Sequence, residues 1–273
     1  MTQFIELSQY TLIRVEGDDA ESYLQGQLTA DVTALAAGDS TFTAHCDPKG
    51  KMSAVFRLIR LSEKRFYALI RTCLLPAALD QLKKYAVFSK VAFTQEEAEP
   101  VGIIGETELP VQAKFNNRAI LINPQSAVAF NADSALWDLA DIQQGYPILT
   151  EQSQFEFIPQ ALNLQAIEQA VSFHKGCYIG QETVARAKYR GANKRAMYVF
   201  KAATDSIPEC GGEIEMQLES GWRKTGTILY ALHADGELWL QVVLNRFEDN
   251  PAFRLAKNQL PLELQPLPYD LDA

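Results

Sequence analysis

The stretch Lys175-Gly176-Cys177-Tyr178-Ile179-Gly180-Gln181-Glu182 places a cysteine between two glycines. Glycine has no side chain, so it permits tight turns and lets other groups approach the backbone closely. A helix is predicted after Gly180 and is expected to stop near Gly191, since glycine is favoured just beyond a helix C-terminus. Such a helix directs its free N–H groups and positive dipole end at the cysteine-bearing turn. The stretch 175–182 is therefore predicted to be the functional centre of the protein.

Cys177 is predicted to be a reactive thiol. The N-terminus of the following helix and the nearby cation of Lys175 both favour the thiolate, which is the reactive form of cysteine. An inert cysteine packed in a structural turn is the alternative, because free cysteine is often a core residue. A hydrolase built on Cys177 and His174 is disfavoured, since Cys/His pairs normally combine distant segments and no orienting group is identifiable.

The composition is that of an ordinary globular protein. Of the 273 residues, 47% are hydrophobic and 22% are charged, which suits one large domain or roughly two to three small ones. The formal net charge of −9 opposes phosphate backbones, so contact with RNA or DNA needs a local basic patch. Because no C-x-x-C pair occurs, neither a zinc site, a disulfide framework nor a permanently bound metal cluster is expected. The cysteines are Cys46, Cys73, Cys177 and Cys210.

The sequence is typical of a cytoplasmic protein. Residues 1–17 lack the basic and long apolar regions of a signal peptide. No apolar run reaches the length of about 18 residues that a membrane-spanning helix needs. We expect reduced thiols and no membrane partner.

The first part of the chain mixes predicted strands and helices. The run 18–21 resembles a capping box with Asp in place of Ser or Thr, and Pro76 suits the first turn of a second helix. Asp133 is expected to cap a helix that carries Trp137, and another helix is predicted over 164–171. Strands are predicted at 10–15, 42–46, 88–93, 101–104 and 119–122, with a hairpin over 55–61 and 65–71.

After about residue 196 the sequence is typical of an all-β segment. The runs AMYVF, TGTILYAL, ELWLQVVL and FRLA are separated by turn signals, and Asp235-Gly236 is a strong hairpin turn. Strands packed this densely, about five or six in roughly 75 residues, predict a small barrel or sandwich. The fold class expected for the whole chain is α+β.

The stretch 175–182 resembles the signature of the YgfZ family of folate-binding proteins. That family belongs to the superfamily of the glycine-cleavage aminomethyltransferase, the T-protein. Further blocks follow the family in order along most of the chain. They are YLQGQLTADV at 23–32, HCDPKGK at 45–51, KYAVFSKV at 84–91, FIPQ at 157–160, VARAK at 184–188 and RGANKR at 190–195.

The resemblance implies a T-protein-like α+β fold with three domains around a central channel. Residues 1–46 and 118–195 would form a discontinuous folate-binding domain. Residues 47–117 would form an inserted α+β domain, and residues 196–273 a C-terminal β-barrel.

The resemblance also implies tetrahydrofolate in the channel, with or without a polyglutamate tail, packed against aromatic side chains. Trp137 stands where relatives carry a tryptophan, whereas Tyr10 replaces another tryptophan. Tyrosine still stacks on a flat heterocycle, though with less area. Gln181 and Glu182 of the signature are assigned to the same folate site. Without the resemblance, Tyr10 and Trp137 are interpreted as ordinary core aromatics.

The function that the resemblance implies is that of an accessory protein rather than a conventional enzyme. Relatives support iron–sulfur enzymes, including one that thiolates tRNA, and Cys177 with Lys175 is implied in this role. The expected partners are reduced folate and client iron–sulfur enzymes met transiently, with tRNA served indirectly. No permanently bound metal is expected.

Two other functions stay open. A folate-dependent one-carbon transferase is the enzyme alternative, but Ala54 or Val55 stands where the T-protein carries its catalytic aspartate, and the T-protein lacks the cysteine of the signature. Direct tRNA binding is the second function, with a basic patch contacting the tRNA phosphates. The same patch could instead bind the polyglutamate tail of a folate, or it could be a solvated helix face without a ligand. The patch consists of Arg186, Lys188, Arg190, Lys194 and Arg195.

Overall fold

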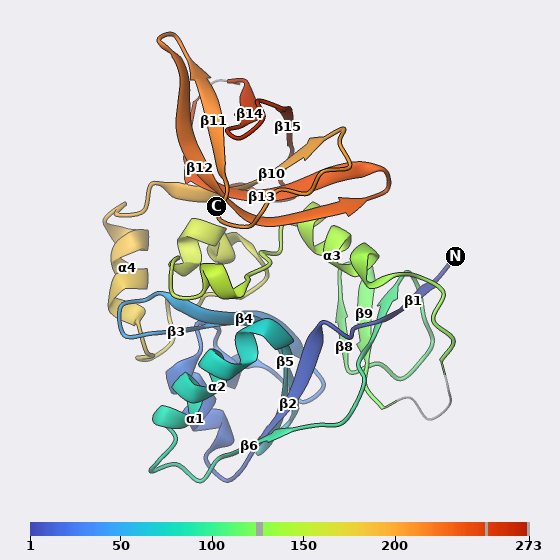
Figure 1. The fold of residues 1–273 in the computed structure, drawn as a ribbon. Coiled ribbons are helices and arrows are strands. Elements are labelled where there is room, and N and C mark those ends of the chain that lie inside the picture. Colours follow the sequence, from blue (N-terminus) through green and yellow to red (C-terminus); the bar gives the residue numbers. More distant parts are fainter. Residues whose placement is uncertain (124–127, 249–250, 272–273) are drawn as a thin grey trace.

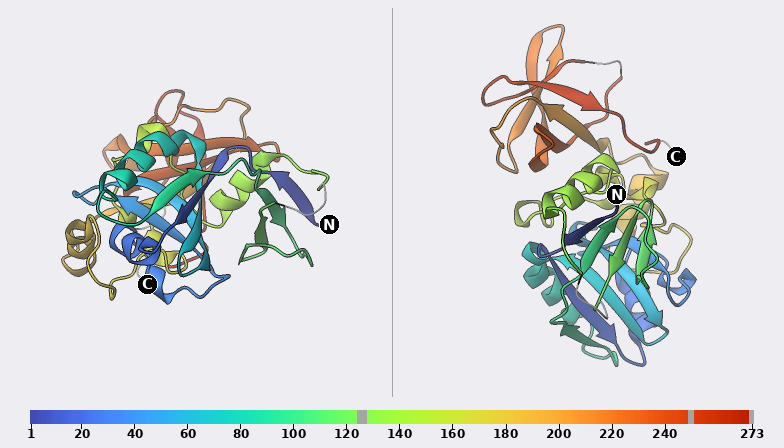
Figure 2. Two further views of the ribbon diagram at one scale, coloured as in Figure 1. Left: turned by 90° about the horizontal axis from the view of Figure 1, so that it is seen from below. Right: turned by 90° about the vertical axis from the view of Figure 1, so that its right-hand side faces the viewer.

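The computed structural model describes residues 1–123, 128–248 and 251–271. Figure 1 shows a β-barrel, coloured orange to red, above a body that contains two further sheets. In the right-hand view of Figure 2 the barrel occupies one end of the molecule, and helix α3 (Ser134–Gln143) lies between it and the sheets. This arrangement confirms the predicted α+β class and the C-terminal barrel.

The larger of the two open sheets has five strands in the order β3-β4-β5-β2-β6, each antiparallel to its neighbours. Helices α1 (Ala20–Gln27) and α2 (Leu75–Lys84) contribute Tyr23, Leu24 and Ala78 to the core beside this sheet. Apolar residues on one helical face explain why each helix packs with one side only. The strands are β2 (Tyr10–Glu16), β3 (Ser40–Cys46), β4 (Met52–Ser62), β5 (Arg65–Arg71) and β6 (Ala92–Gln95).

The second sheet has four strands in the order β1-β7-β9-β8 and lies on the right of Figure 1. Helix α3 begins after Asp133, whose Oδ1 accepts a hydrogen bond from the backbone N–H of Ala135, as the cap prediction requires. Trp137 packs so closely on the sheet that a Cβ at Gly102 would lie 2.6 Å from the indole ring. The strands are β1 (Gln3–Glu6), β7 (Val101–Ile104), β8 (Ala113–Phe115) and β9 (Arg118–Leu121).

The C-terminal strands close into a barrel in the order β10-β13-β12-β11-β14-β15. Its interior is filled by apolar side chains such as Phe200, Leu240 and Phe253. Asp235 and Gly236 join β12 to β13 with φ angles of 53° and 78°, which confirms the predicted hairpin turn. The strands are β10 (Arg195–Ala202), β11 (Glu213–Leu218), β12 (Gly221–Ala234), β13 (Glu237–Asn245), β14 (Phe253–Leu255) and β15 (Pro261–Gln265).

Helix α4 (Gln181–Tyr189) follows the signature and lies on the left flank of the molecule in Figure 1. Gly191 takes a φ of 60° just beyond it, which confirms the predicted C-terminal glycine. Within the part of the chain that the structure describes, no helix is long and apolar enough to cross a membrane. The short 3₁₀ turns are Val32–Ala34, Thr72–Leu74, Glu151–Ser153, Pro159–Leu162 and Leu164–Ala166.

The helix predicted over 164–171 is wrong. Only the 3₁₀ turn Leu164–Ala166 forms there, because Glu168 takes the left-handed φ of 46° and a right-handed helix cannot continue through such a residue. The backbone reversal turns the Glu168 carboxylate towards Arg57 of β4.

Two predictions near the N-terminal sheet are also wrong. The capping box over 18–21 does not form, since α1 has no side-chain cap and Asp19 Oδ2 instead accepts a hydrogen bond from the backbone N–H of Lys90. The strand expected from Phe88 begins only at Ala92, and the Phe88 side chain is exposed. The interaction between Asp19 and Lys90 joins segments too distant in sequence for a local pattern to reveal.

Strands from two of the predicted domains share one sheet. The boundary expected after residue 46 falls between β3 and β4, which pair with each other, and β2 pairs with β5. The division of the chain into three domains stays a prediction.

Candidate functional site

The signature loop is fastened to the segment before β3 by a buried lysine. Lys175 Nζ donates hydrogen bonds to the backbone carbonyls of Leu28 and Ala30, each at 2.7 Å, and lies 5.0 Å from the ring centre of Tyr178. Burial lowers the pKa of Lys175 to about 8. Lys175 is therefore an anchor of the loop, and its predicted support of the Cys177 thiolate stays a prediction.

The turn before β4 packs directly on the start of α4. Gly50 and Gly180 have φ angles of 77° and 83°, which favour glycine. A Cβ at Gly180 would lie 2.6 Å from the carbonyl oxygen of Asp47, and one at Gly50 would lie 2.7 Å from Thr183 Cβ. Three sequence blocks, 23–32, 45–51 and 175–182, thus meet around one loop.

Cys177 lies on the surface of this loop, whereas the neighbouring Tyr178 is buried. Cys46 is buried, and burial raises the pKa of its thiol. Cys73 is exposed, but partial desolvation still raises the pKa of its thiol. Cys177 is accessible to a partner, which excludes the buried alternative, while its reactivity stays a prediction.

Tyr10 and Trp137, predicted to bind folate, line one small inner cavity of about 40 Å³. A cavity of that size has room for only a few water molecules, since roughly 10–15 Å³ of such space suffices for one. Gln181 and Glu182, predicted for the same site, lie on α4 and are not among the residues that line the cavity. The remaining lining residues are Phe42, Val55, Phe56, Arg57, Leu69, Arg71, Phe115, Ile120, Asp141, Tyr146, Pro147 and Ile148.

Ion pairs surround the inner cavity, and the sequence patterns did not identify them. Arg71 donates to both carboxylate oxygens of Asp138, at 2.9 and 3.0 Å, and Arg118 Nη1 donates to Asp141 Oδ1 at 2.6 Å. Desolvation raises the pKa of Asp141, since its partners only partly compensate for the lost water. Arg118 is buried, and its Nε and Nη2 have no hydrogen-bond partner among the described residues. Arg118 is not among the lining residues, but its guanidinium lies 4.8 Å from the ring centres of Phe115 and Trp137, so these free donors lie behind the aromatic wall of the cavity.

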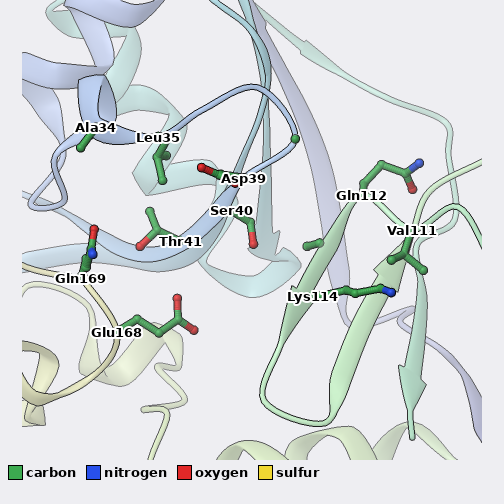
Figure 3. Close-up of a pocket in the computed structure, with 12 residues that line it drawn as sticks. Ala34, Leu35, Asp39, Ser40, Thr41, Val111, Gln112, Lys114, Glu168 and Gln169 are labelled. Atoms are coloured by element: carbon green, nitrogen blue, oxygen red, sulfur yellow. The ribbon is translucent and has the colours of Figure 1, made fainter. Parts of the chain in front are cut away.

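A second opening, the outer cleft, lies between the loop before β3 and strand β8 (Figure 3). Its volume is about 800 Å³, and β3 and β8 are each the edge strand of their sheet. Polar groups dominate its lining, with Lys114 on one side and Glu168 on the other in Figure 3. The lining residues are Ala34, Leu35, Gly38, Asp39, Ser40, Thr41, Val111, Gln112, Ala113, Lys114, Glu168 and Gln169.

The ion pair between Arg57 and Glu168 separates the outer cleft from the inner cavity. Glu168 lines the cleft, Arg57 lines the cavity, and Arg57 Nη2 lies 2.7 Å from Glu168 Oε1. Burial acts to raise the pKa of Glu168, but Arg57 and the hydroxyl of Tyr146 lower it on balance. The Arg57 guanidinium lies 3.4 Å from the ring centre of Phe115. Opening the inner cavity thus requires moving Arg57 and Phe115.

The predicted basic patch is only partly gathered in one place. Arg186, Lys194 and Arg195 line a third opening, the basic cleft, of about 510 Å³, together with Lys51. Lys188 and Arg190 are not among the residues that line it, and Arg186 forms an ion pair with Glu182 within α4. Lys51, from the turn before β4, was not recognised as part of this patch because it is distant in sequence. No group of three or more His, Cys, Asp or Glu residues that could hold a metal occurs in the described ranges.

The fold is that of an aminomethyltransferase-like protein. The glycine cleavage system aminomethyltransferase T from Bartonella henselae matches 99% of this chain and 87% of its own, with a TM-score of 0.69 at 14% sequence identity. Residues 2–107 match the model of the GCVT N-terminal domain, and residues 193–258 match the model of the YgfZ beta-barrel domain.

Relatives give the particular family. The chain is 38% identical to the tRNA-modifying protein YgfZ of Photorhabdus laumondii, over 98% of this chain and 92% of the relative. It is 39% identical to the tRNA-modifying protein YgfZ of Yersinia pseudotuberculosis over the same shares. An uncharacterized protein of Haemophilus influenzae is 57% identical over 99% of both chains. The chain belongs to the YgfZ family of tRNA-modifying proteins.

Proposed function

We propose that this protein is a tetrahydrofolate-binding accessory factor that supports tRNA thiolation and the iron–sulfur enzymes involved in it. The observation that carries the proposal is the inner cavity, where Trp137 and Tyr10 stand beside buried charges behind a wide cleft. The relatives' name, tRNA-modifying protein, supports the tRNA part. Reduced folate, bound with or without a polyglutamate tail, supplies a one-carbon-carrying heterocycle.

The lining residues suit a reduced folate in chemical type. Its flat heterocycle packs on aromatic faces such as that of Trp137, and its ring N–H groups need acceptors such as Asp141. The guanidinium groups of Arg57 and Arg71, which line the cavity, are donors of the kind that suits the ring oxygen. Since the inner cavity is small, binding of a folate there requires the side chains of Arg57 and Phe115 to move. The volume of the outer cleft lies within the usual range of ligand sites, about 300–1,000 Å³.

The residues that line the same cavity favour an accessory role over one-carbon transfer. Val55 lines it and Ala54 is buried, so apolar side chains stand where the T-protein correspondence expects its aspartate. The carboxylates nearby, Asp141 and Glu168, are each bound by an arginine. Neither is a free base for proton transfer to or from a substrate.

In this proposal the exposed Cys177 approaches the client. Its loop is rigidly fastened through Lys175 and Gly180, while the thiol itself is open to solvent. Client iron–sulfur enzymes meet it transiently in the cytoplasm, and no permanently bound metal is needed. Gln181 and Glu182, at the start of α4, then belong to the client-facing loop rather than to the heterocycle.

The test is a titration with tetrahydrofolate followed by tryptophan fluorescence. Saturable quenching is expected in the native protein and in Trp222→Phe, which alters an exposed barrel residue. It is expected to be lost in Trp137→Phe, together with a lower affinity measured by calorimetry. Equal affinity in Trp137→Phe and Trp222→Phe would remove Trp137 from the site.

A second experiment distinguishes an accessory protein from a one-carbon transferase. The protein is incubated with methylene-tetrahydrofolate, ammonia and a dithiol acceptor, and folate species are counted by chromatography. Stoichiometric binding without interconversion is the expected result. Sustained turnover would establish the transferase instead.

A further inference from the structure

The basic cleft concentrates positive charge on an acidic molecule. Among the residues that line it, Lys51, Arg186, Lys194 and Arg195 are cationic and only Glu156 is acidic, whereas the whole chain carries a net charge of −9. Thr183, Asn193 and Asn245 add groups that can donate hydrogen bonds. This local excess is the basic patch that an acidic protein needs to hold a polyanion.

The cations of this cleft are only partly neutralised by the protein. Arg186 is paired with Glu182, and Lys51 Nζ donates to the backbone carbonyl of Glu156 at 2.7 Å. Lys194 and Arg195 are exposed and form no ion pair with any described residue. Their charge is therefore available to a ligand.

An exposed aromatic residue, outside the lining of the cleft, ends the helix that contributes Arg186 to it. The side chain of Tyr189 is 67% exposed at the end of α4, between Lys188 and Arg190, and its ring meets Phe173 edge to face at 6.3 Å. Lys188 Nζ lies 5.4 Å from the Phe173 ring centre. Cations interleaved with an exposed ring are typical of surfaces that bind single-stranded nucleic acid through phosphates and base stacking.

We propose that the basic cleft and Tyr189 bind the phosphate backbone and one base of single-stranded RNA, such as an unpaired tRNA loop. A polyglutamate tail also offers anions, but it has no ring to stack on Tyr189. The choice of RNA over DNA rests on the proposed function in tRNA modification. The contact is direct, whereas the sequence alone favoured an indirect relation to tRNA.

The basic cleft lies near the Cys177 loop and away from the outer cleft. Cys177 is exposed on the loop that leads into α4, so RNA along α4 lies beside the thiol. The outer cleft is elsewhere: α4 lies on the left flank in Figure 1, and the sheet that contributes β8 lies on the right. RNA and folate therefore occupy separate sites.

The test is fluorescence anisotropy of a labelled unstructured RNA and of a labelled tRNA with the full chain, over a series of KCl concentrations. Lys194→Ala/Arg195→Ala is expected to lower the affinity roughly tenfold at low salt. It should reduce the slope of log K against log salt by about 1.4, since each lost phosphate contact on a single strand changes it by about 0.7. The matched control removes the same charge elsewhere, in Lys83→Ala/Lys84→Ala at the exposed end of α2.

Tyr189 is tested by two substitutions. Tyr189→Ala should weaken binding of unstructured RNA several-fold without changing the salt slope, because stacking carries no counterion release, and Tyr189→Phe should restore it. An equal loss in the Lys83/Lys84 control, an unchanged salt slope in the cleft variant, or efficient competition by a polyglutamate peptide but not by unlabelled RNA would each overturn the proposal.

The folate titration is repeated on the cleft variants. Unchanged folate affinity beside weakened RNA binding is the expected result, because the sites are separate. RNA binding without any folate binding would refute the proposed function but leave this inference standing, and folate binding without RNA binding would do the reverse.

Discussion

The inner cavity and the Cys177 loop differ in whether their charged side chains are buried or exposed to solvent. Around the cavity, Arg118 and Asp141 are buried together and cannot exchange their partners for water. At the loop the anchor Lys175 is the buried charged residue, whereas Cys177 and the cations of α4 face solvent. The inner cavity therefore depends on charged side chains held in place away from water, whereas the Cys177 loop depends on being accessible to a partner. Substitutions in the two regions should therefore differ greatly in their effect on stability.

Arg118→Met should have the largest effect. It leaves Asp141 buried without its cation, which costs about 3–5 kcal/mol in comparable buried pairs. The free energy of unfolding, from urea titration followed by circular dichroism, measures it. The control is Arg65→Met, whose pair with Glu16 is largely exposed and contributes about 0–1 kcal/mol.

A second variant keeps this prediction decisive. Arg118→Met/Asp141→Asn should recover part of the loss, because the unpaired charge is removed. Similar costs for Arg118→Met and Arg65→Met would show that the charges around the cavity are not desolvated, and the contrast with the loop would disappear.

Lys175→Met should have an intermediate effect, because it leaves the carbonyls of Leu28 and Ala30 without their donor. Such a loss costs about 1–3 kcal/mol. It should also depend on pH. Since the pKa of Lys175 falls from the usual 10.5 to about 8 in the folded protein, the unfolded chain binds more protons between these values. The native protein therefore gains stability as pH rises from about 8 to 10.5, and the variant lacks this gain.

The measurement is urea unfolding of both proteins at several pH values across that window. The difference between native and Lys175→Met should grow by an amount on the order of 1–3 kcal/mol. Lys49→Met, which alters an exposed lysine in the neighbouring turn, is the control and should show no such growth. A constant difference for Lys175→Met would mean that the ammonium reaches solvent and that the loop is looser than the hydrogen bonds indicate.

The same contrast explains what the sequence could reveal. Local signals located the cap at Asp133, the hairpin turn at Asp235-Gly236 and the helix after Gly180, because each depends on residues adjacent in the chain. The sequence blocks that resemble the YgfZ family, which follow one another in the same order, predicted the family and the C-terminal barrel. Each of these features depends on short stretches of residues that are adjacent in the chain.

The charges around the inner cavity gave no such signal. Arg57 and Glu168 are 111 residues apart, and Arg71 and Asp138 are 67 residues apart. A partial clue existed on α3, where Asp138 and Asp141 lie among apolar residues one turn apart, and acidic groups in such a helix need buried partners. Which arginines would pair with them depends on strand order, which the sequence patterns left open.

Cys177→Ala should have the smallest effect on stability, less than about 0.5 kcal/mol, since it trims an exposed side chain in a loop held by other residues. Its effect on chemistry should be large. In the native protein at neutral pH, limited alkylation followed by mass spectrometry should modify Cys177 first, and the variant should lose this fast phase. Cys73 is the matched control, because it is also exposed but desolvation raises the pKa of its thiol and slows it. Labelling of Cys73 ahead of Cys177 would show that exposure alone does not make the loop thiol reactive, and the client-facing role of Cys177 would have to be abandoned even if folate binds.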